Sequence, residues 1–151
     1  MEQKFVKYLL ASFTKFSEMY GFIKANEVDN AQDYRIEYSS DVFTIRLEKY
    51  RQEFYATLFK TGNPDNGVNL FNLLSYLNQA GPNVPRAKYF KDEKDLEECY
   101  RKQLDYLSTT IDNNFEVINN FFETGKYELK MADIKTFMLS KYPELFKKVD
   151  S

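Results

Sequence analysis

The sequence contains no histidine, no tryptophan and a single cysteine, Cys99. Without histidine, the chain cannot form the Ser-His or Cys-His pairs of common nucleophilic enzymes, and it offers no imidazole to a metal ion. One cysteine forms no intramolecular disulfide and completes no cysteine-based zinc site. These absences exclude most common hydrolase designs, and a lack of disulfides is typical of proteins in a reducing cytoplasm.

Glycine is also scarce, with five residues that never cluster. Neither G-x-G-x-x-G nor G-x-x-x-x-G-K-[ST] occurs, so the sequence supplies no phosphate-binding loop. Residues 63–67 (Asn-Pro-Asp-Asn-Gly) resemble a calcium loop only superficially, because the leading acid and the bidentate glutamate of that motif are missing. We therefore expect no cofactor, no bound metal ion and no catalytic activity.

Long apolar runs are absent as well. No window approaches the roughly 20 apolar residues that span a bilayer, and lysines interrupt the apolar residues near the amino terminus. We expect a soluble cytoplasmic protein that has no signal peptide and binds no membrane. The 151 residues, 43% hydrophobic and 29% charged, are typical of one globular domain over 1–151. Aromatic residues reach 17%, so large rings must fill much of the core.

Two segments carry apolar residues at helical spacing. Residues 5–20 predict a first helix that ends at Gly21. From Leu96 to Phe122 the apolar residues repeat every eleven positions, about 3.67 per turn, which predicts one nearly straight helix over 92–123. Its weak point is expected at the Ser-Thr-Thr run 108–110. Shorter helices are predicted after Asn69, stopped by Gly81-Pro82, around Ile134 to Tyr142, and from Pro143 to Val149.

The middle of the first half has a period of two. Residues 26–33 carry three acids and no base and predict a loop, whereas 34–38 and 43–47 alternate as strands. Residues 54–59 predict a third strand that is apolar or aromatic on both faces. The predicted fold is α+β: an antiparallel β-meander of three or more strands packed against an N-terminal helix and a long helix in the C-terminal half. We expect a buried set that comprises Phe5, Leu9, Phe13, Ile36, Ile45, Leu104, Ile111 and Phe115.

Charge is distributed unevenly along the chain. Residues 92–124 hold nine acids and three bases, whereas both ends of the chain are slightly basic. The candidate partner-binding residues are Glu93, Glu97, Asp105 and Asp112, which would attract a basic protein. A solvated helix face with favourable N-terminal acids explains the same pattern. The alternative binding surface is the aromatic outer face of the sheet. A pI of 5.3 without a cationic stripe argues against nucleic acid.

Cys99 and the carboxylate pairs are the side chains that could support a reactive thiol or a metal site. Cys99 follows two acids, Glu97 and Glu98, which do not favour a reactive thiolate, so we expect a buried structural cysteine. Carboxylate pairs such as Asp92 and Asp95 could hold magnesium in a carboxylate-dependent metal hydrolase, although acids in a first helical turn also complement the helix dipole. A structural homo-oligomer held by the aromatic sheet face is a third possibility.

The first half of the chain resembles a group of known proteins. The resemblance covers residues 5–77 and lies in Met-Tyr-Gly-Phe at 19–22, Tyr-Arg-Ile-Glu-Tyr-Ser-Ser-Asp at 34–41, and the strands 43–47 and 54–59. These features are similar to small bacterial α+β proteins of the polymorphic-toxin immunity type. The resemblance implies a cytosolic, non-enzymatic inhibitor that binds and blocks a partner, and it assigns no functional residue.

Overall fold

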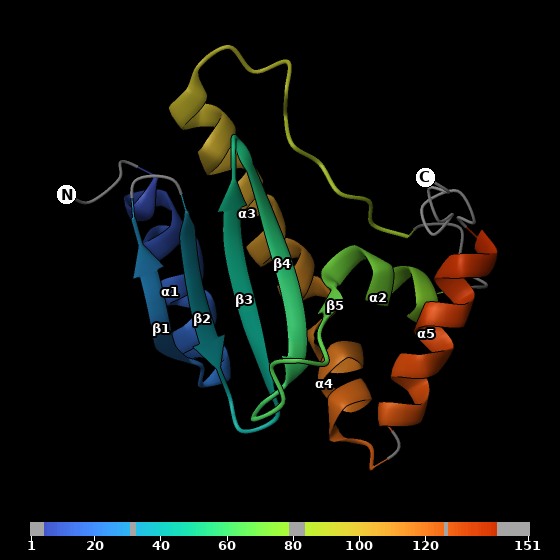
Figure 1. Cartoon of the computed structure of the whole chain (residues 1–151). Helices are drawn as coiled ribbons and strands as arrows, with labels where there is room; N and C mark the ends of the chain where they lie inside the picture. The colour runs from blue at the N-terminus through green and yellow to red at the C-terminus, as the bar shows by residue number, and fades with distance from the viewer. Residues whose placement is uncertain (1–4, 31–32, 79–83, 126, 142–151) are drawn as a thin grey trace.

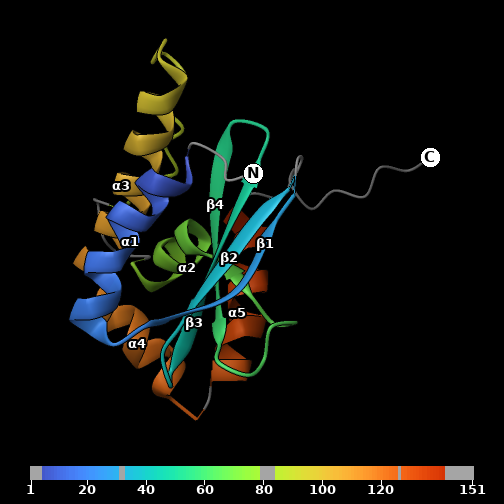
Figure 2. The ribbon, with the colours of Figure 1, turned by 90° about the vertical axis from the view of Figure 1, so that its left-hand side faces the viewer.

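A computed structural model describes residues 5–30, 33–78, 84–125 and 127–141. It has the predicted α+β fold, with a five-stranded antiparallel sheet in the order β1-β2-β3-β4-β5. Helices α1, α3 and α4 lie on one side of this sheet (Figure 2), and α5 lies beside α2 beyond β5 (Figure 1). In chain order the elements are α1 Val6–Tyr20, β1 Ile23–Asp29, β2 Tyr34–Ser39, β3 Phe43–Tyr50, β4 Glu53–Lys60, β5 Val68–Asn69, α2 Leu70–Leu77, α3 Leu96–Asn113, α4 Phe115–Glu123 and α5 Tyr127–Lys141.

The predicted first helix is confirmed as α1. Its apolar stripe buries Leu9, Phe13 and Phe16 against the sheet. Gly21 ends the helix in the left-handed conformation at a φ of 73°, and its N–H donates to the Ser17 carbonyl. A residue without a side chain adopts this conformation at the least cost, so the sequence itself fixes where the helix ends.

Aromatic rings fill the core, as the composition predicts. The Phe5 ring meets Tyr34 edge-on with 4.9 Å between centroids, and Phe43 stacks on Phe122 at 5.4 Å. Seven of the eight residues expected to be buried are at most 3% exposed. Phe115 is the exception: it is only partly buried, because it lies at the rim of the core and stacks on the Tyr20 ring.

The prediction of a loop over 26–33 is wrong for residues 26–29, because β1 continues to Asp29. This strand pairs with β2 and forms one edge of the sheet, where nearly all of its residues are exposed on both faces. Its register shifts between Ala25 and Val28, and Asn26 has a φ of 47°. A strand with two solvated faces and a bulge shows no alternation of apolar residues, so the sequence pattern hides it.

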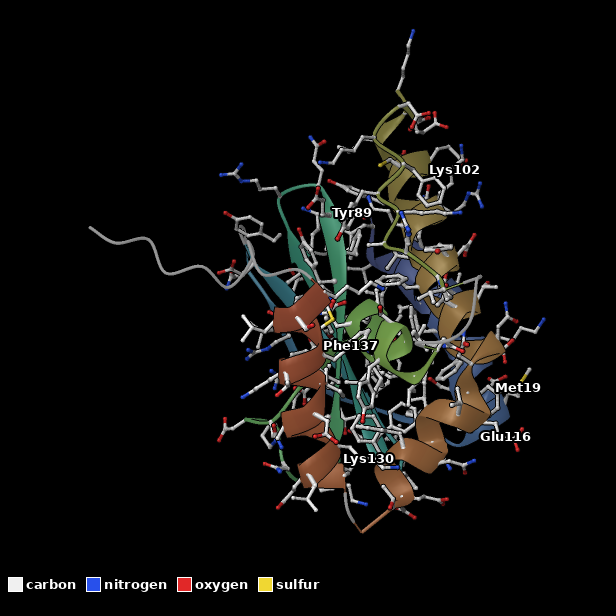
Figure 3. All side chains as sticks on the ribbon, turned by 90° about the vertical axis from the view of Figure 1, so that its right-hand side faces the viewer. Met19, Tyr89, Lys102, Glu116, Lys130 and Phe137 are labelled. Atoms are coloured by element: carbon white, nitrogen blue, oxygen red, sulfur yellow. The ribbon has the colours of Figure 1, made fainter. Side chains whose placement is uncertain are left out.

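The predicted long helix is two helices. The first, α3, begins at Leu96 because the Asp95 side chain caps it, and the chain leaves helical geometry at Asn114, with φ −117° and ψ 16°. The Asn114 side chain donates to the Thr110 carbonyl at 2.8 Å, which satisfies an acceptor at the helix end. The expected weak point at 108–110 lies inside α3. Beyond the break, α4 bends toward α5 (Figure 3).

The remaining helices are placed largely as predicted. Asn69 caps α2 by accepting bonds from the Phe71 and Asn72 N–H groups, and α5 contains Ile134. The predicted stop at 81–82 and the predicted terminal helix over 143–149 lie outside the described residues. No helix within the described ranges is both long enough and apolar enough to cross a membrane.

Candidate protein-binding surface

Two of the four predicted binding carboxylates, Asp105 and Asp112, bond to α1. The Ser12 hydroxyl donates a hydrogen bond to Asp105 at 2.6 Å, and the Tyr20 hydroxyl donates one to Asp112. This bond to Asp112 raises the pKa of Tyr20, because the carboxylate accepts from the neutral hydroxyl. Both carboxylates therefore help to hold α3 against α1.

Glu97 lies on the same side of α3. The Tyr8 hydroxyl donates to Glu97 over 3.4 Å, and the Lys7 ammonium lies 3.9 Å from the same carboxylate. Three of the predicted residues thus form one row, but the row faces a neighbouring helix. We call it the α1–α3 seam, defined by the pairs Tyr8–Glu97, Ser12–Asp105 and Tyr20–Asp112.

Glu93 lies apart from the seam, in the turn before α3. The Lys102 ammonium donates to it at 2.6 Å, which lowers the pKa of Glu93 and raises that of Lys102. Figure 3 shows Lys102 far from Met19 and Glu116, which mark the other end of this helical layer. Of the four predicted residues, Glu93 is thus paired with α3 itself, whereas the other three bond to α1.

The outer face of the sheet, the alternative surface, is closed at its centre by its own side chains. Glu37 is buried and accepts hydrogen bonds from Asn26 and Arg46, each at 2.9 Å. The Arg46 guanidinium lies 5.0 Å from the Phe59 ring centroid, and Phe59 is buried as well. The bulge in β1 brings Asn26 to this network, so hydrogen-bonded polar side chains lie among the aromatic residues of the outer face.

A hollow opens at the β3–β4 hairpin, where the strands meet the segment that leads into α3. It has a volume of about 650 Å³ and is lined by Tyr50, Arg51, Tyr89, Lys94 and Leu96 among others. Tyr50 is 58% exposed and Leu96 45%, so large apolar surfaces border it. Tyr89 lies beside the hairpin in Figure 3. We call this feature the hairpin-end hollow.

A buried glutamine holds the walls of this hollow in place. Gln103 is 1% exposed; its oxygen accepts from the Phe54 N–H at 2.9 Å, and its amide donates to the Gln52 carbonyl at 2.9 Å. On the opposite wall, the Cys99 thiol donates to the Tyr89 carbonyl at 3.2 Å. Cys99 is thus the buried structural cysteine that the sequence predicts, and the hollow rests on a hydrogen-bonded frame.

The acidic side chains of the hollow are engaged in internal pairs. Glu53 accepts from Tyr55 and from Lys91, the latter at 2.9 Å, and both bonds lower the pKa of Glu53. Within the described residues, Arg51 and Lys94 have no carboxylate at ion-pair distance. The Arg51 guanidinium instead lies 5.3 Å from the Tyr50 ring. The hollow therefore presents two cations without a direct ion pair beside exposed aromatic surface, and one of them, Arg51, also helps to lower the pKa of Glu53.

The hollow is also where the backbone departs from preferred geometry. Tyr50 pairs with Glu53, which leaves a two-residue turn that begins with Arg51 at a φ of 56°. Phe90, which lies between the lining residues Tyr89 and Lys91, has a φ of 51°. Glycine, asparagine or aspartate usually takes such positions, because bulkier side chains meet a steric cost there. Strained residues of this kind cluster at functional sites.

No motif in the sequence marks this surface. The only signal is indirect: a tight turn between two well-patterned strands contains Arg51 and Gln52 and no glycine, asparagine or aspartate. Among the residues that the structure describes, no three cysteine, aspartate or glutamate side chains are grouped so that they could hold a metal ion. Comparison of the chain with protein-family models, curated proteins and solved structures finds no match.

Proposed function

We propose that the protein is a non-catalytic protein-binding domain and that it binds its partner at the hairpin-end hollow. The proposal is carried by one observation: Tyr50 and Leu96 are exposed on the rim of a hollow whose frame is fixed by buried hydrogen bonds. Tyrosine and arginine are enriched among the residues that dominate binding energy at interfaces. A rigid frame lowers the entropic cost of binding.

We further propose that binding takes place in the cytoplasm and is inhibitory. The resemblance of residues 5–77 to immunity proteins of polymorphic toxin systems supports a toxin as the partner. Such inhibition needs only that a partner's surface is occupied, so it requires shape and charge and no reacting groups. The hairpin-end hollow supplies both, with a volume of about 650 Å³ and cations at its rim.

Photo-crosslinking in the native cells tests this proposal. A photoreactive phenylalanine at Tyr50 should form a covalent adduct with one partner protein, which mass spectrometry would identify. The matched control is the same residue at Thr109, which is exposed on α3. An adduct formed at position 109 and not at position 50 would place the partner on the acidic helix and overturn the proposed surface.

A further inference from the structure

We infer that the hairpin-end hollow receives an acidic segment of the partner protein, whose carboxylates meet Arg51 and Lys94. The inference rests on the proposed function, because it names the chemistry of the partner bound at the same surface. It reverses the expectation of a basic partner that the acids of residues 92–124 suggest. Three of those acids belong to the α1–α3 seam.

Charge pairing inside the hollow favours a carboxylate over an ammonium. Glu53 is paired with Lys91 at 2.9 Å, and Glu93 with Lys102 at 2.6 Å. A basic segment would have to compete with these lysines for their carboxylates. An acidic segment meets two cations that have no ion-pair partner in the described part of the chain, so it displaces no existing pair. The net charge of −2 on the whole protein therefore does not describe this surface.

Arginine at the tip of the turn suits this role. Its planar guanidinium donates two parallel hydrogen bonds to one carboxylate, and its contact with the Tyr50 ring restricts where it points. Lys94 adds a flexible second charge on the opposite wall. Between them, Tyr50 and Leu96 offer apolar surface that excludes water from a bound ion pair, which strengthens the pair.

The backbone supplies an independent argument. Arg51 adopts a φ of 56° in a turn where glycine would be unstrained, so the arginine lowers stability at its own position. Residues that break a local rule without a local gain mark functional positions. Arg51→Gly should therefore separate two properties: it should raise the midpoint of urea unfolding and weaken the binding of an acidic ligand. A residue with a purely structural role would not move these two readouts in opposite directions.

Three capped peptides serve as probes: N-acetyl-Glu-Phe-Glu-amide, its Gln-Phe-Gln counterpart and its Lys-Phe-Lys counterpart. Each is titrated into the ¹⁵N-labelled full chain at low salt, and amide resonances are followed by NMR. We expect the acidic probe to shift resonances of residues 50–53 and 89–96 saturably. Its affinity should exceed that of the neutral probe by roughly tenfold, equivalent to about 1.4 kcal/mol, and should fall as salt screens the charges.

Two variants locate the interaction. Arg51→Gly combined with Lys94→Gln should remove most of that roughly tenfold preference for the acidic probe. Lys130→Gln is the control, since Lys130 lies on α5 away from Tyr89 (Figure 3), and it should leave the affinity unchanged. Retention of the preference in the folded double variant would overturn the inference.

Other outcomes are equally decisive. Stronger binding of the basic probe, shifts that map outside the hollow, or no saturable shift with the acidic probe would each reject an acidic segment. A single-stranded thymidine octamer that binds the hollow more tightly than the acidic peptide would point to nucleic acid instead. Crosslinking at position 50 distinguishes a failure of this inference from a failure of the proposed function. An adduct at position 50, together with no binding of the acidic probe, would support the proposed function and reject only the acidic partner segment.

Discussion

The α1–α3 seam and the hairpin-end hollow show how little a local count of charges says about what a surface offers. The seam lies in the most acidic part of the sequence, yet three of its carboxylates accept hydrogen bonds from side chains of α1. The hollow joins the β3–β4 hairpin to the start of the same acidic segment, yet its acids are paired and two of its cations have no ion pair among the described residues. Carboxylates that already accept hydrogen bonds within the fold would have to share or give up those bonds to bind a partner.

The largest expected effect comes from removing the frame beneath the hollow. Gln103→Met keeps the side-chain volume and deletes the bonds to the Phe54 N–H and the Gln52 carbonyl. Because backbone groups are left without partners, we expect a loss of about 2–3 kcal/mol in the free energy of unfolding, measured by urea denaturation. Gln52→Met is the matched control: its side chain is exposed, and it should cost less than about 0.5 kcal/mol. Equal losses in the two variants would show that Gln103 does not support the hairpin.

The same substitution, tyrosine to phenylalanine, can be made at the α1–α3 seam and at the hairpin-end hollow, so its effects on stability compare the two regions directly. Tyr8→Phe combined with Tyr20→Phe removes the donors to Glu97 and Asp112, and should cost about 1–2 kcal/mol of unfolding free energy. Tyr50→Phe at the hollow should cost less than about 0.3 kcal/mol, because that ring is exposed. If the Tyr50 variant lost as much as the seam variant, the distinction between engaged and available groups would fail.

Much of the fold follows from the sequence because its apolar patterns are strong. The stripe of α1 and the alternation in β2 to β4 each report a face that is buried in the structure. The stripe in the C-terminal half is less informative, since Ile111, Phe115 and Ile118 keep helical spacing across the break at Asn114. A helix that breaks for one residue and resumes in phase leaves no mark on that spacing.

The candidate site is less predictable than the fold. The sequence does not show which side chain will donate a hydrogen bond to a given carboxylate. In the seam, the two partners of each pair are separated by about 90 residues along the chain. The hollow depends on Gln103, whose role becomes visible only when the hairpin is placed against α3. Long-range hydrogen bonds of this kind depend on how the helices and strands pack together. The spacing of apolar residues along the sequence does not show that packing.

Tyr38 allows a smaller test on the sheet beneath α1. Its ring stacks on Phe13, and its buried hydroxyl has no hydrogen-bond partner among the described residues. Burial raises the pKa of Tyr38 to about 12, so the folded state keeps the proton that an unfolded tyrosine releases near pH 10. The stability linked to this proton is present below about pH 10 and is lost as pH rises toward 12.

We therefore expect Tyr38→Phe to stabilise the protein by about 1 kcal/mol at neutral pH, because an unsatisfied polar group is removed. Its advantage over the parent should grow between about pH 10 and pH 12. Urea unfolding at neutral pH and near pH 10.5 measures both effects. A destabilised Tyr38→Phe variant would mean that the hydroxyl forms a favourable bond in solution.

Apart from the control variants, the smallest expected effect on stability is that of Arg51→Gly. Relief of the left-handed conformation should raise the free energy of unfolding by about 0.5–1 kcal/mol, partly offset by the greater freedom of glycine in the unfolded chain. Gly62, already left-handed at a φ of 95°, provides the reverse control. Gly62→Ala should destabilise, and an Arg51→Gly variant that also destabilises would show that the arginine contributes more to the turn than its strain costs.

Hydrogen exchange of the non-covalent complex, formed by the unmodified protein and the partner that crosslinking identifies, tests the central claim most directly, because it reports on the backbone amides of both surfaces. The account predicts new protection at residues 50–53 and 89–96, and none along the solvent-facing side of α3. Protection concentrated on α3 around Glu97, Asp105 and Asp112, with the hairpin unchanged, would contradict it and return the binding site to the acidic helix.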